Sequence, residues 1–558
     1  MVNTIDNIAL KKLSEDIRKS KTIYDIVAAA CMAFEPYSPQ KKRGYIPEKY
    51  RVLTDSITNF DHFFETDPEE AFVQLQMEIL SWLSKHQGID YSDLYALIYN
   101  IDRNHIYKEK VVSLSNRTST IKEIFGLNNI TCTSYRIFPR LNNTLAKKMD
   151  DACKQATGKP FRTQGFGMSY TLNSDMKNYD ILDVAQEEFP PVIHRFSKSA
   201  ADVITQRVKR KGDRLTAGLF PLWGGNRIKT LDPKYTEKTF YIEQMCPYAE
   251  KMIRKRVFKA LERCKEMGVD IAIFPEMLMT RSILDDVKKY VNDNVINNIV
   301  EAQENEFPVL FVMGTIWESV EEMGILDQRN VSVVLSGSGD VIIEQHKQTP
   351  FQFKKPNHTY AEDGPFAGHK EELSLTDKTI HIIDIEGIGR VFTHICLDVL
   401  NPRLMTLLKI LCADLVLVPA FSPSKELKEE LESLTKGYWS TVLLCNACSA
   451  LCDLNDEWIS YEIINENIKV KDEKVKDEKE NDKDYLEIGF ILTPAKYGTG
   501  KSLALDSLHF SESCISCQID GCPGRIIDIY YQNYLKPDKK HNYGRIDVRI
   551  DDTGERKK

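Results

Sequence analysis

The C-terminal part of the sequence predicts an α/β sandwich, in which two sheets pack inside and helices cover the outside. Strand-like and helical patterns alternate here: an apolar run at residues 215–220 is followed by residues 248–267, whose apolar positions recur at a helical period before a stop at Gly268. Several short runs of β-branched and apolar residues also end at one polar residue, which is typical of buried strands whose tips emerge at a sheet edge. Such alternation favours sheets inside and helices outside.

Residues 1–210 lack this alternation and predict a mainly helical domain. The strongest helix pattern begins at Asp67-Pro68 and runs to Lys85 with a broad apolar side, and residues 23–34 and 141–157 are also helix-like. Because no set of reactive side chains stands out in this region, we expect it to have a regulatory or partner-binding role.

The predicted α/β domain spans residues 211–535 and is followed by a polar tail at 536–558. Inside the domain, residues 468–484 carry a tandem Val-Lys-Asp-Glu-Lys repeat, at 470–474 and 475–479, among further charged residues. This composition cannot bury apolar area, so we expect a solvated insertion there.

Composition limits the classes of function. The chain has 558 residues, enough for two or three domains that each bury a core. A formal net charge of −8 and a pI near 5.9 argue against nucleic-acid binding as the main activity.

The sequence predicts a cytoplasmic protein without a membrane anchor. Residues 1–20 are polar and lack the apolar core of a signal peptide. The longest apolar region, residues 404–421, contains Lys409 and Asp414 and is unsuited to crossing a bilayer. Thirteen cysteines, an odd number, fit a reducing cytosol better than a framework of disulfides.

Four cysteines raise the question of a structural zinc site. Cys445 and Cys448 form one C-x-x-C pair, Cys514 and Cys517 form another, and two such pairs hold zinc where they converge. The first pair follows apolar residues that predict a buried strand, where cysteine behaves as a small hydrophobic side chain. Core packing is therefore the favoured interpretation, and we expect neither a metal nor an organic cofactor.

Three of the strand-like runs each lead to one reactive side chain. Residues 271–276 end at Glu276, residues 341–347 end at Lys347, and residues 390–398 contain Cys396. A thiol is mostly protonated at neutral pH and needs a base and a nearby cation to act as a nucleophile. A carboxylate, an ammonium and a thiol that meet at one sheet edge would form such a set.

These motifs resemble those of the nitrilase superfamily of carbon–nitrogen hydrolases, whose Glu, Lys and Cys occur in this order. The resemblance covers roughly residues 214–535, and its best-matched pieces are residues 268–276, residues 330–334 leading through Gly339 to His346-Lys347, residues 395–398 with Pro402, and residues 412–420. It implies a nitrilase-like αββα sandwich preceded by the helical domain.

The resemblance also implies the roles of individual residues. Glu276 matches the general base of the family, Lys347 its oxyanion-stabilising lysine and Cys396 its nucleophile. The backbone N–H of Leu397 is expected to assist at the oxyanion. The family uses a second glutamate after the lysine, and Glu362 is its nearest counterpart in this sequence.

The function that the resemblance implies is amidase-type hydrolysis of a non-peptide carbon–nitrogen bond through a thioester intermediate. Small amides, carbamoyl compounds and nitriles all form an adduct with the thiol, so nitrile hydrolysis and acyl transfer stay open as alternatives. A different class of function is a sensor or scaffold gated by the N-terminal domain or by a protein partner. The resemblance further implies a homodimer or a higher homo-oligomer.

Overall fold

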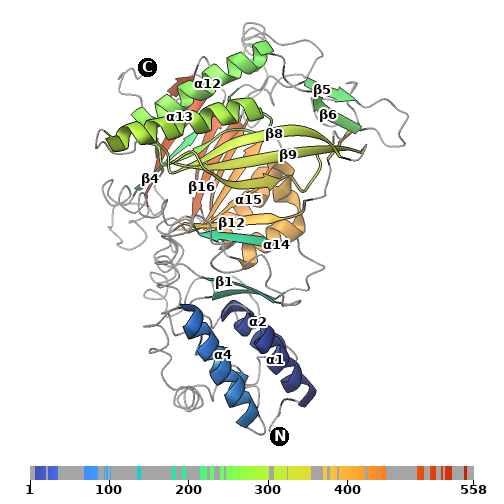
Figure 1. Cartoon of the computed structure of the whole chain (residues 1–558). Helices are drawn as coiled ribbons and strands as arrows, with labels where there is room; N and C mark the ends of the chain where they lie inside the picture. The colour runs from blue at the N-terminus through green and yellow to red at the C-terminus, as the bar shows by residue number, and fades with distance from the viewer. Residues whose placement is uncertain are drawn as a thin grey trace. The chain divides into compact units, whose positions relative to one another are not determined.

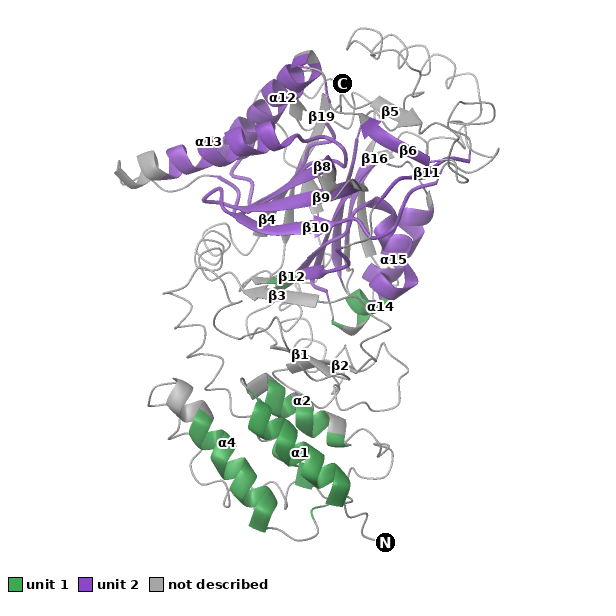
Figure 2. Ribbon diagram, turned by 45° about the vertical axis from the view of Figure 1, so that its right-hand side comes forward, with its two compact units in different colours: residues 1–199, 382–390, 406–412 green, residues 200–381, 391–405, 413–558 purple. Residues whose placement is uncertain are grey.

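The chain divides into two compact units. The computed structural model describes, with short gaps, residues 5–34, 68–101, 135–139, 179–183, 192–196, 214–222, 227–230, 239–300, 307–352, 368–447, 487–494, 503–509, 517–519, 522–530 and 546–548. Unit 1 comprises residues 1–199, 382–390 and 406–412, and unit 2 comprises residues 200–381, 391–405 and 413–558 (Figure 2). The three reactive residues of the predicted triad all belong to unit 2.

Unit 1 contains three described helices, α1 (Asn7–Lys19), α2 (Ile23–Phe34) and α4 (Pro68–Lys85), and the strands β1 (Tyr135–Pro139), β2 (Tyr179–Asp183) and β3 (Val192–Phe196). Helices α2 and α4 occupy two of the predicted helical segments, whereas the third, at 141–157, lies outside the described residues. The side chain of Gln76 on α4 donates a hydrogen bond to the carbonyl of Ile17 at the end of α1. The antiparallel pair β1–β2 is an addition to the predicted helices.

The first sheet of unit 2 has the strand order β10-β9-β8-β7-β4-β19-β18, and β20 also pairs with β19. Its strands are β4 (Arg214–Leu219), β7 (Ile271–Ile273), β8 (Leu310–Glu322), β9 (Ile325–Ser336), β10 (Val341–His346), β18 (Cys517–Ile519), β19 (Cys522–Tyr530) and β20 (Ile546–Val548). β4, β7 and β8 are parallel neighbours. β20 lies in the predicted tail, and its apolar ends Ile546 and Val548 pair with Ile529 and Ile527.

In the second sheet, the strands of unit 2 follow the order β17-β16-β15-β14-β13. They are β13 (Gly389–Thr393), β14 (Leu415–Ala420), β15 (Thr441–Asn446), β16 (Glu487–Pro494) and β17 (Leu503–His509). β13 and the neighbouring β12 (Ile380–Ile385) both cross the division between the units. Every residue of β14 and β15 is buried, as expected of parallel strands covered on both faces. Cys445 is one of them and is a free, buried cysteine.

The two sheets of unit 2 pack on each other, since β14 contacts β8 and β15 contacts β4 and β7. Helices α12 (Pro247–Glu266) and α13 (Arg281–Val300) lie along the first sheet, and α15 (Lys425–Tyr438) covers the second (Figure 1). The short helix η4 (Cys396–Leu400) also belongs to unit 2, whereas α14 (Pro402–Ile410) crosses the division between the units. The predicted α/β class, with sheets inside and helices outside, is confirmed in unit 2.

A small third sheet completes unit 2. It has the order β11-β6-β5, with β5 (Arg227–Thr230), β6 (Thr239–Glu243) and β11 (Lys370–Glu371). β11 runs parallel to β6, so that Glu371 pairs with Phe240. The pairing with β6 therefore fixes the position of the acidic residue Glu371.

Two features are absent from the part of the chain that the structure describes. None of its helices combines the length and apolar character needed to cross a bilayer. It also contains no cluster of histidine, cysteine and acidic side chains arranged to hold a metal ion. Of the four cysteines considered for zinc, Cys448 and Cys514 lie outside the described residues.

Candidate active site

Glu276 lies where strands of both large sheets end. β7 stops at Ile273, and the Glu276 backbone N–H then donates to the carbonyl of Ala420, the last residue of β14, at 3.3 Å. The next residue, Met277, has a positive φ of 59° and donates its N–H to Thr315 Oγ1 at 2.8 Å. The turn after β7 therefore directs the Glu276 side chain inward, where it is 1% exposed.

Gly314 makes room for this turn. Its φ is +69°, and a Cβ at this position would overlap the carbonyl oxygen of Pro275. The register between β8 and β9 shifts between Val312 and Thr315, which marks a bulge around the glycine. A residue without a side chain is required here so that β8 can approach the backbone that leads to Glu276.

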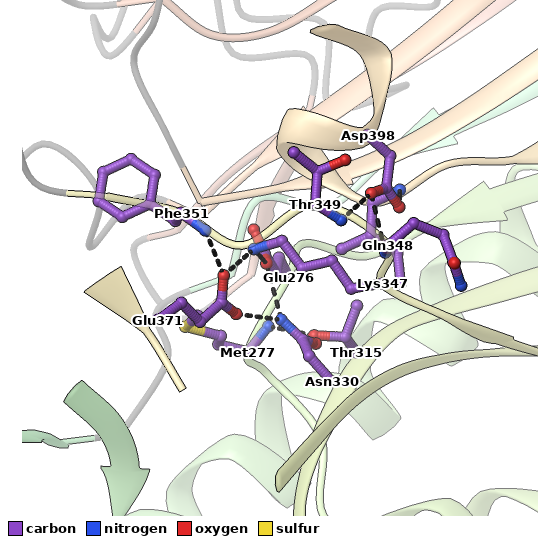
Figure 3. Close-up of polar contacts among 11 residues, drawn as sticks. Glu276, Met277, Thr315, Asn330, Lys347, Gln348, Thr349, Phe351, Glu371 and Asp398 are labelled. Atoms are coloured by element: carbon purple, nitrogen blue, oxygen red, sulfur yellow. Dashed lines mark hydrogen bonds and ion pairs between the residues drawn. The ribbon is translucent and has the colours of Figure 1, made fainter. Parts of the chain in front are cut away.

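Lys347 follows the last residue of β10 and is held by both its backbone and its side chain. Its N–H donates to the carbonyl of Asn330 on β9 at 2.9 Å. Its ammonium lies 2.7 Å from Glu276 Oε1 and 2.7 Å from Glu371 Oε2, with all three side chains buried (Figure 3). Burial alone would lower the pKa of Lys347, but the charges of Glu276 and Glu371 raise it well above its ordinary value. The ammonium therefore stays charged.

Cys396 lies at the turn between β13 and η4. The backbone N–H of His394 still continues the strand pattern by donating to Leu417 on β14, and Cys396 then adopts a positive φ of 48°. A residue other than glycine with a positive φ carries backbone strain. Such strain is common where a nucleophile lies on a tight turn. Leu397 follows in the first turn of η4. The role of its N–H at an oxyanion stays a prediction.

The Cys396 thiol holds its proton in this environment. Burial raises the pKa of the thiol well above its ordinary value and the charge of Glu276 adds to this, against the opposing effects of Lys347 and of the Phe421 backbone N–H. Burial also raises the pKa of the Glu276 carboxyl, while Lys347 lowers it. A free thiolate is thus disfavoured at rest, and proton transfer from Cys396 to Glu276 is expected to accompany attack on a substrate.

Glu371 is a residue of the site that the sequence did not reveal. Its Oε2 accepts hydrogen bonds from Lys347 Nζ and from the backbone N–H of Phe351, both at 2.7 Å (Figure 3). Glu362, the predicted second glutamate, lies outside the described residues. A two-residue strand has no periodicity to detect, so only the pairing of β11 with β6 shows that Glu371 belongs here.

Asn330 joins the two carboxylates. Its Nδ2 donates to Glu276 Oε1 at 2.8 Å and to Glu371 Oε1 at 3.2 Å, and the residue is fully buried. Each of the two amide protons can therefore serve one carboxylate. Two like charges that share one ammonium repel each other, and Asn330 gives each of them a further fixed donor without adding charge.

Asp398 connects the loop after Lys347 to the turn that carries Cys396. Its Oδ1 accepts the backbone N–H of Gln348 at 2.9 Å and that of Thr349 at 2.8 Å, and its Oδ2 accepts that of Ile395 at 3.2 Å. Burial raises the pKa of Asp398 to about 7, although the charge of Lys347 acts to lower it. The carboxyl thus fixes the lysine and the cysteine relative to each other.

Replacing Asp398 with asparagine is expected to change how stability depends on pH. A carboxyl with a raised pKa in the folded protein stabilises the fold fully below its ordinary value of 3.8 and loses this contribution as the pH rises through about 7. The free energy of unfolding of the wild type should therefore fall relative to that of Asp398→Asn over this range. Denaturant unfolding of both proteins at several pH values measures the difference, and parallel curves would argue against a raised pKa.

The chain is similar to several solved structures, while no family model and no curated protein sequence matches it. An amidase from Nesterenkonia sp. is 13% identical with a TM-score of 0.27, over 42% of this chain and 76% of that one. Nit3 of Saccharomyces cerevisiae, a member of branch 10 of the nitrilase superfamily, is 15% identical with a TM-score of 0.26, over 53% and 90%. A glutamine-dependent NAD+ synthetase from Acinetobacter baumannii is 14% identical with a TM-score of 0.31, over 61% and 49%.

Proposed function

We propose that this protein is a carbon–nitrogen hydrolase that cleaves a small, non-peptide amide through Cys396. The observation that carries the proposal is the buried Lys347 ammonium, which lies 2.7 Å from each of two carboxylates and interacts with the Cys396 thiol. These residues follow the order of the triad in the nitrilase superfamily, which the motifs of this chain resemble. A base and a cation in direct contact, both of which act on the pKa of a thiol, are what nucleophilic attack on a carbonyl carbon requires.

The first half of the proposed reaction forms a thioester. Glu276 takes the proton of the Cys396 thiol as the sulfur attacks the amide carbon, and the carbonyl oxygen becomes an oxyanion. Lys347 and the backbone N–H of Leu397 stabilise this charge. Glu276 then gives the proton to the amide nitrogen, the carbon–nitrogen bond breaks, and ammonia or an amine leaves.

The second half releases the acid. Water attacks the thioester carbon as Glu276 accepts a proton from it, and the carbon–sulfur bond then breaks while Glu276 returns this proton to the sulfur, which regenerates the Cys396 thiol. The carboxylic acid leaves as the second product. Glu371 acts in both halves by keeping Lys347 charged and in place.

Ammonia release together with trapping of the thioester tests this function. The purified chain is incubated with primary amides, carbamoyl compounds and nitriles, and ammonia is measured with and without hydroxylamine. A thioester transfers its acyl group to hydroxylamine in competition with water, so both ammonia and a hydroxamate are expected from an amide. Ammonia without hydroxamate would contradict the thioester, and acid formed from nitriles alone would reassign the substrate.

Replacing Asn330 with alanine is expected to lower kcat by about ten- to a hundredfold, because misplacing reactive groups by a fraction of an ångström is costly. Loss of a donor to the Glu276 carboxylate should also raise its pKa, so the acidic limb of kcat/KM should move to higher pH. Ser332→Ala is the matched control, since Ser332 is also fully buried, lies two residues along β9 and has a hydroxyl without a hydrogen-bond partner among the described residues. If the acidic limb of the pH profile of kcat/KM were unchanged in Asn330→Ala, Asn330 would contribute only to packing and not to the pKa of Glu276.

A further inference from the structure

An apolar cluster lies directly beside the charged residues of the site. Its buried members are Phe240, Ile242 and Met277, and the partly exposed side chains of Trp317, Phe351 and Phe421 pack against them. We call these six residues the aromatic cluster. Phe240 and Phe351 meet edge to face, with ring centroids 6.4 Å apart. The cluster brings together five segments that are distant in the sequence: β6, the turn after β7, β8, the segment after Lys347 and the residue after β14.

Three members of the aromatic cluster are tied to the reactive groups. Met277 directly follows Glu276 in the chain and donates its N–H to Thr315. The backbone N–H of Phe351 donates to Glu371 Oε2 at 2.7 Å, and Figure 3 shows Phe351 and Met277 beside Glu371. Phe421 directly follows Ala420, whose carbonyl accepts the Glu276 N–H at 3.3 Å, and a hydrogen bond from the Phe421 backbone N–H acts to lower the pKa of the Cys396 thiol. An acyl group bonded to this sulfur would therefore start next to Phe421.

Trp317 belongs to the same side of the site. On β8 it pairs with Asn330 of β9, so both side chains leave the sheet on the same face. Its indole N–H donates to Gln328 Oε1 at 2.7 Å, which fixes the ring while leaving its face apolar. A held, partly exposed indole close to buried reactive groups is a surface suited to an apolar ligand.

The charges of the site disfavour an anionic ligand. Glu276 and Glu371 carry two negative charges against the single positive charge of Lys347, and this ammonium lies 2.7 Å from both carboxylates. Nearby, Arg281 forms ion pairs with Glu318 and Glu344. The aromatic cluster itself contains no ionisable side chain, so a charged group placed on it would lose its hydration without gaining a partner from the cluster.

We infer that the substrate is a carboxamide whose acyl group is uncharged and apolar and rests on Trp317, Phe351 and Phe421. This inference rests on the proposed hydrolysis at Cys396. The free energy gained by burying the apolar acyl group is present both in the bound substrate and in the thioester. It therefore lowers the barrier measured from the free enzyme and substrate, and the preference should appear in kcat/KM along a series of amides.

Two sets of primary amides test the inference: a series of increasing chain length, and charged amides of about the same length as hexanamide. Propanamide, butanamide, pentanamide and hexanamide report the gain per methylene, which is expected to be about three- to fourfold in kcat/KM. Hexanamide is compared with 4-carbamoylbutanoate and 5-aminopentanamide, which have similar length but carry a negative and a positive charge. Hexanamide is expected to exceed both by at least about a hundredfold, since an unpaired charge on an apolar surface is costly.

Variants test whether the preference for longer apolar amides depends on the side chains of the aromatic cluster. Trp317→Leu and Phe421→Leu should reduce the ratio of hexanamide to propanamide kcat/KM, whereas Phe258→Leu should leave it unchanged. Phe258 is a matched control because it is a partly buried aromatic that packs edge to face on Tyr290 between α12 and α13. A ratio of two substrates in one variant does not depend on the fraction of folded protein.

The outcomes separate the inference from the proposed function. Hydrolysis with a flat chain-length series, or with a preference for a charged amide, would overturn the apolar acyl group and leave the hydrolase intact. If no amide is hydrolysed, calorimetry with Cys396→Ala still measures binding: hexanamide bound more tightly than 4-carbamoylbutanoate supports the inference, and equal or reversed binding overturns it.

Discussion

Replacing Cys396 with alanine is expected to reduce ammonia release by at least about four orders of magnitude, because the covalent route through the thioester is lost. The fold should survive. Alanine removes a single buried sulfur atom, which costs its interactions with the Phe421 backbone N–H and the Glu276 carboxyl but leaves no charge buried without a partner. Steady-state assays at high protein concentration, with unfolding curves of the same preparation, measure both effects.

Cys445→Ala is the control for this loss. Cys445, on β15, is also a free and fully buried cysteine, and burial likewise raises the pKa of its thiol. The two variants therefore delete the same group from similar surroundings, but only Cys396 interacts with Glu276 and Lys347. Equal activity of the two variants, whether both retained or both lost, would contradict a specific nucleophilic role for Cys396.

Replacing Lys347 with methionine is expected to destabilise the protein by about 3–5 kcal/mol, the usual cost of removing one partner from a buried ion pair. The variant leaves Glu276 and Glu371 buried at short range without their shared cation. Protonation relieves this repulsion, so the difference from the wild type should shrink as the pH falls. Activity should be lost as well, because the oxyanion then lacks its cation.

Two comparisons make this result specific. The double variant Lys347→Met with Glu371→Gln removes one of the stranded charges and should regain part of the lost stability while staying inactive. Lys436→Met removes a lysine from an exposed pair with Glu432 on α15 and should cost no more than about 0.5 kcal/mol. If Lys347→Met were as stable as Lys436→Met, the buried ammonium could not be the ion that holds the two carboxylates together.

The sequence predicts the α/β class and the residues at strand ends, because both depend on local patterns. Glu276, Lys347 and Cys396 each follow a run of apolar residues, and buried strands deliver their last residues to a shared edge. The structure brings these three together, while their roles stay proposals. The pairing of β20 with β19 shows that a short strand within polar surroundings escapes such pattern analysis.

Glu371 and Asn330 could not be assigned from the sequence for physical reasons. Glu371 lies on a strand of two residues, and its position depends on β6, more than a hundred residues earlier in the chain. Asn330 falls within a recognisable motif, but its two hydrogen bonds depend on how β9 lies against the ends of β7 and β11. Contacts of this kind come from tertiary packing and leave no periodic signal.

The hydrogen bonds around Asn330 form a closed ring. Its carbonyl accepts the Lys347 N–H, its side chain donates to Glu276, and the Lys347 ammonium returns to the same Glu276 oxygen. A ring resists distortion at any one point because the other bonds keep their partners in register. The aromatic cluster contributes no side chain to this ring, and Phe351 meets the neighbouring Glu371 through its backbone N–H. Side chains of that cluster are therefore the natural place to redesign substrate choice, since changing them leaves the ring intact.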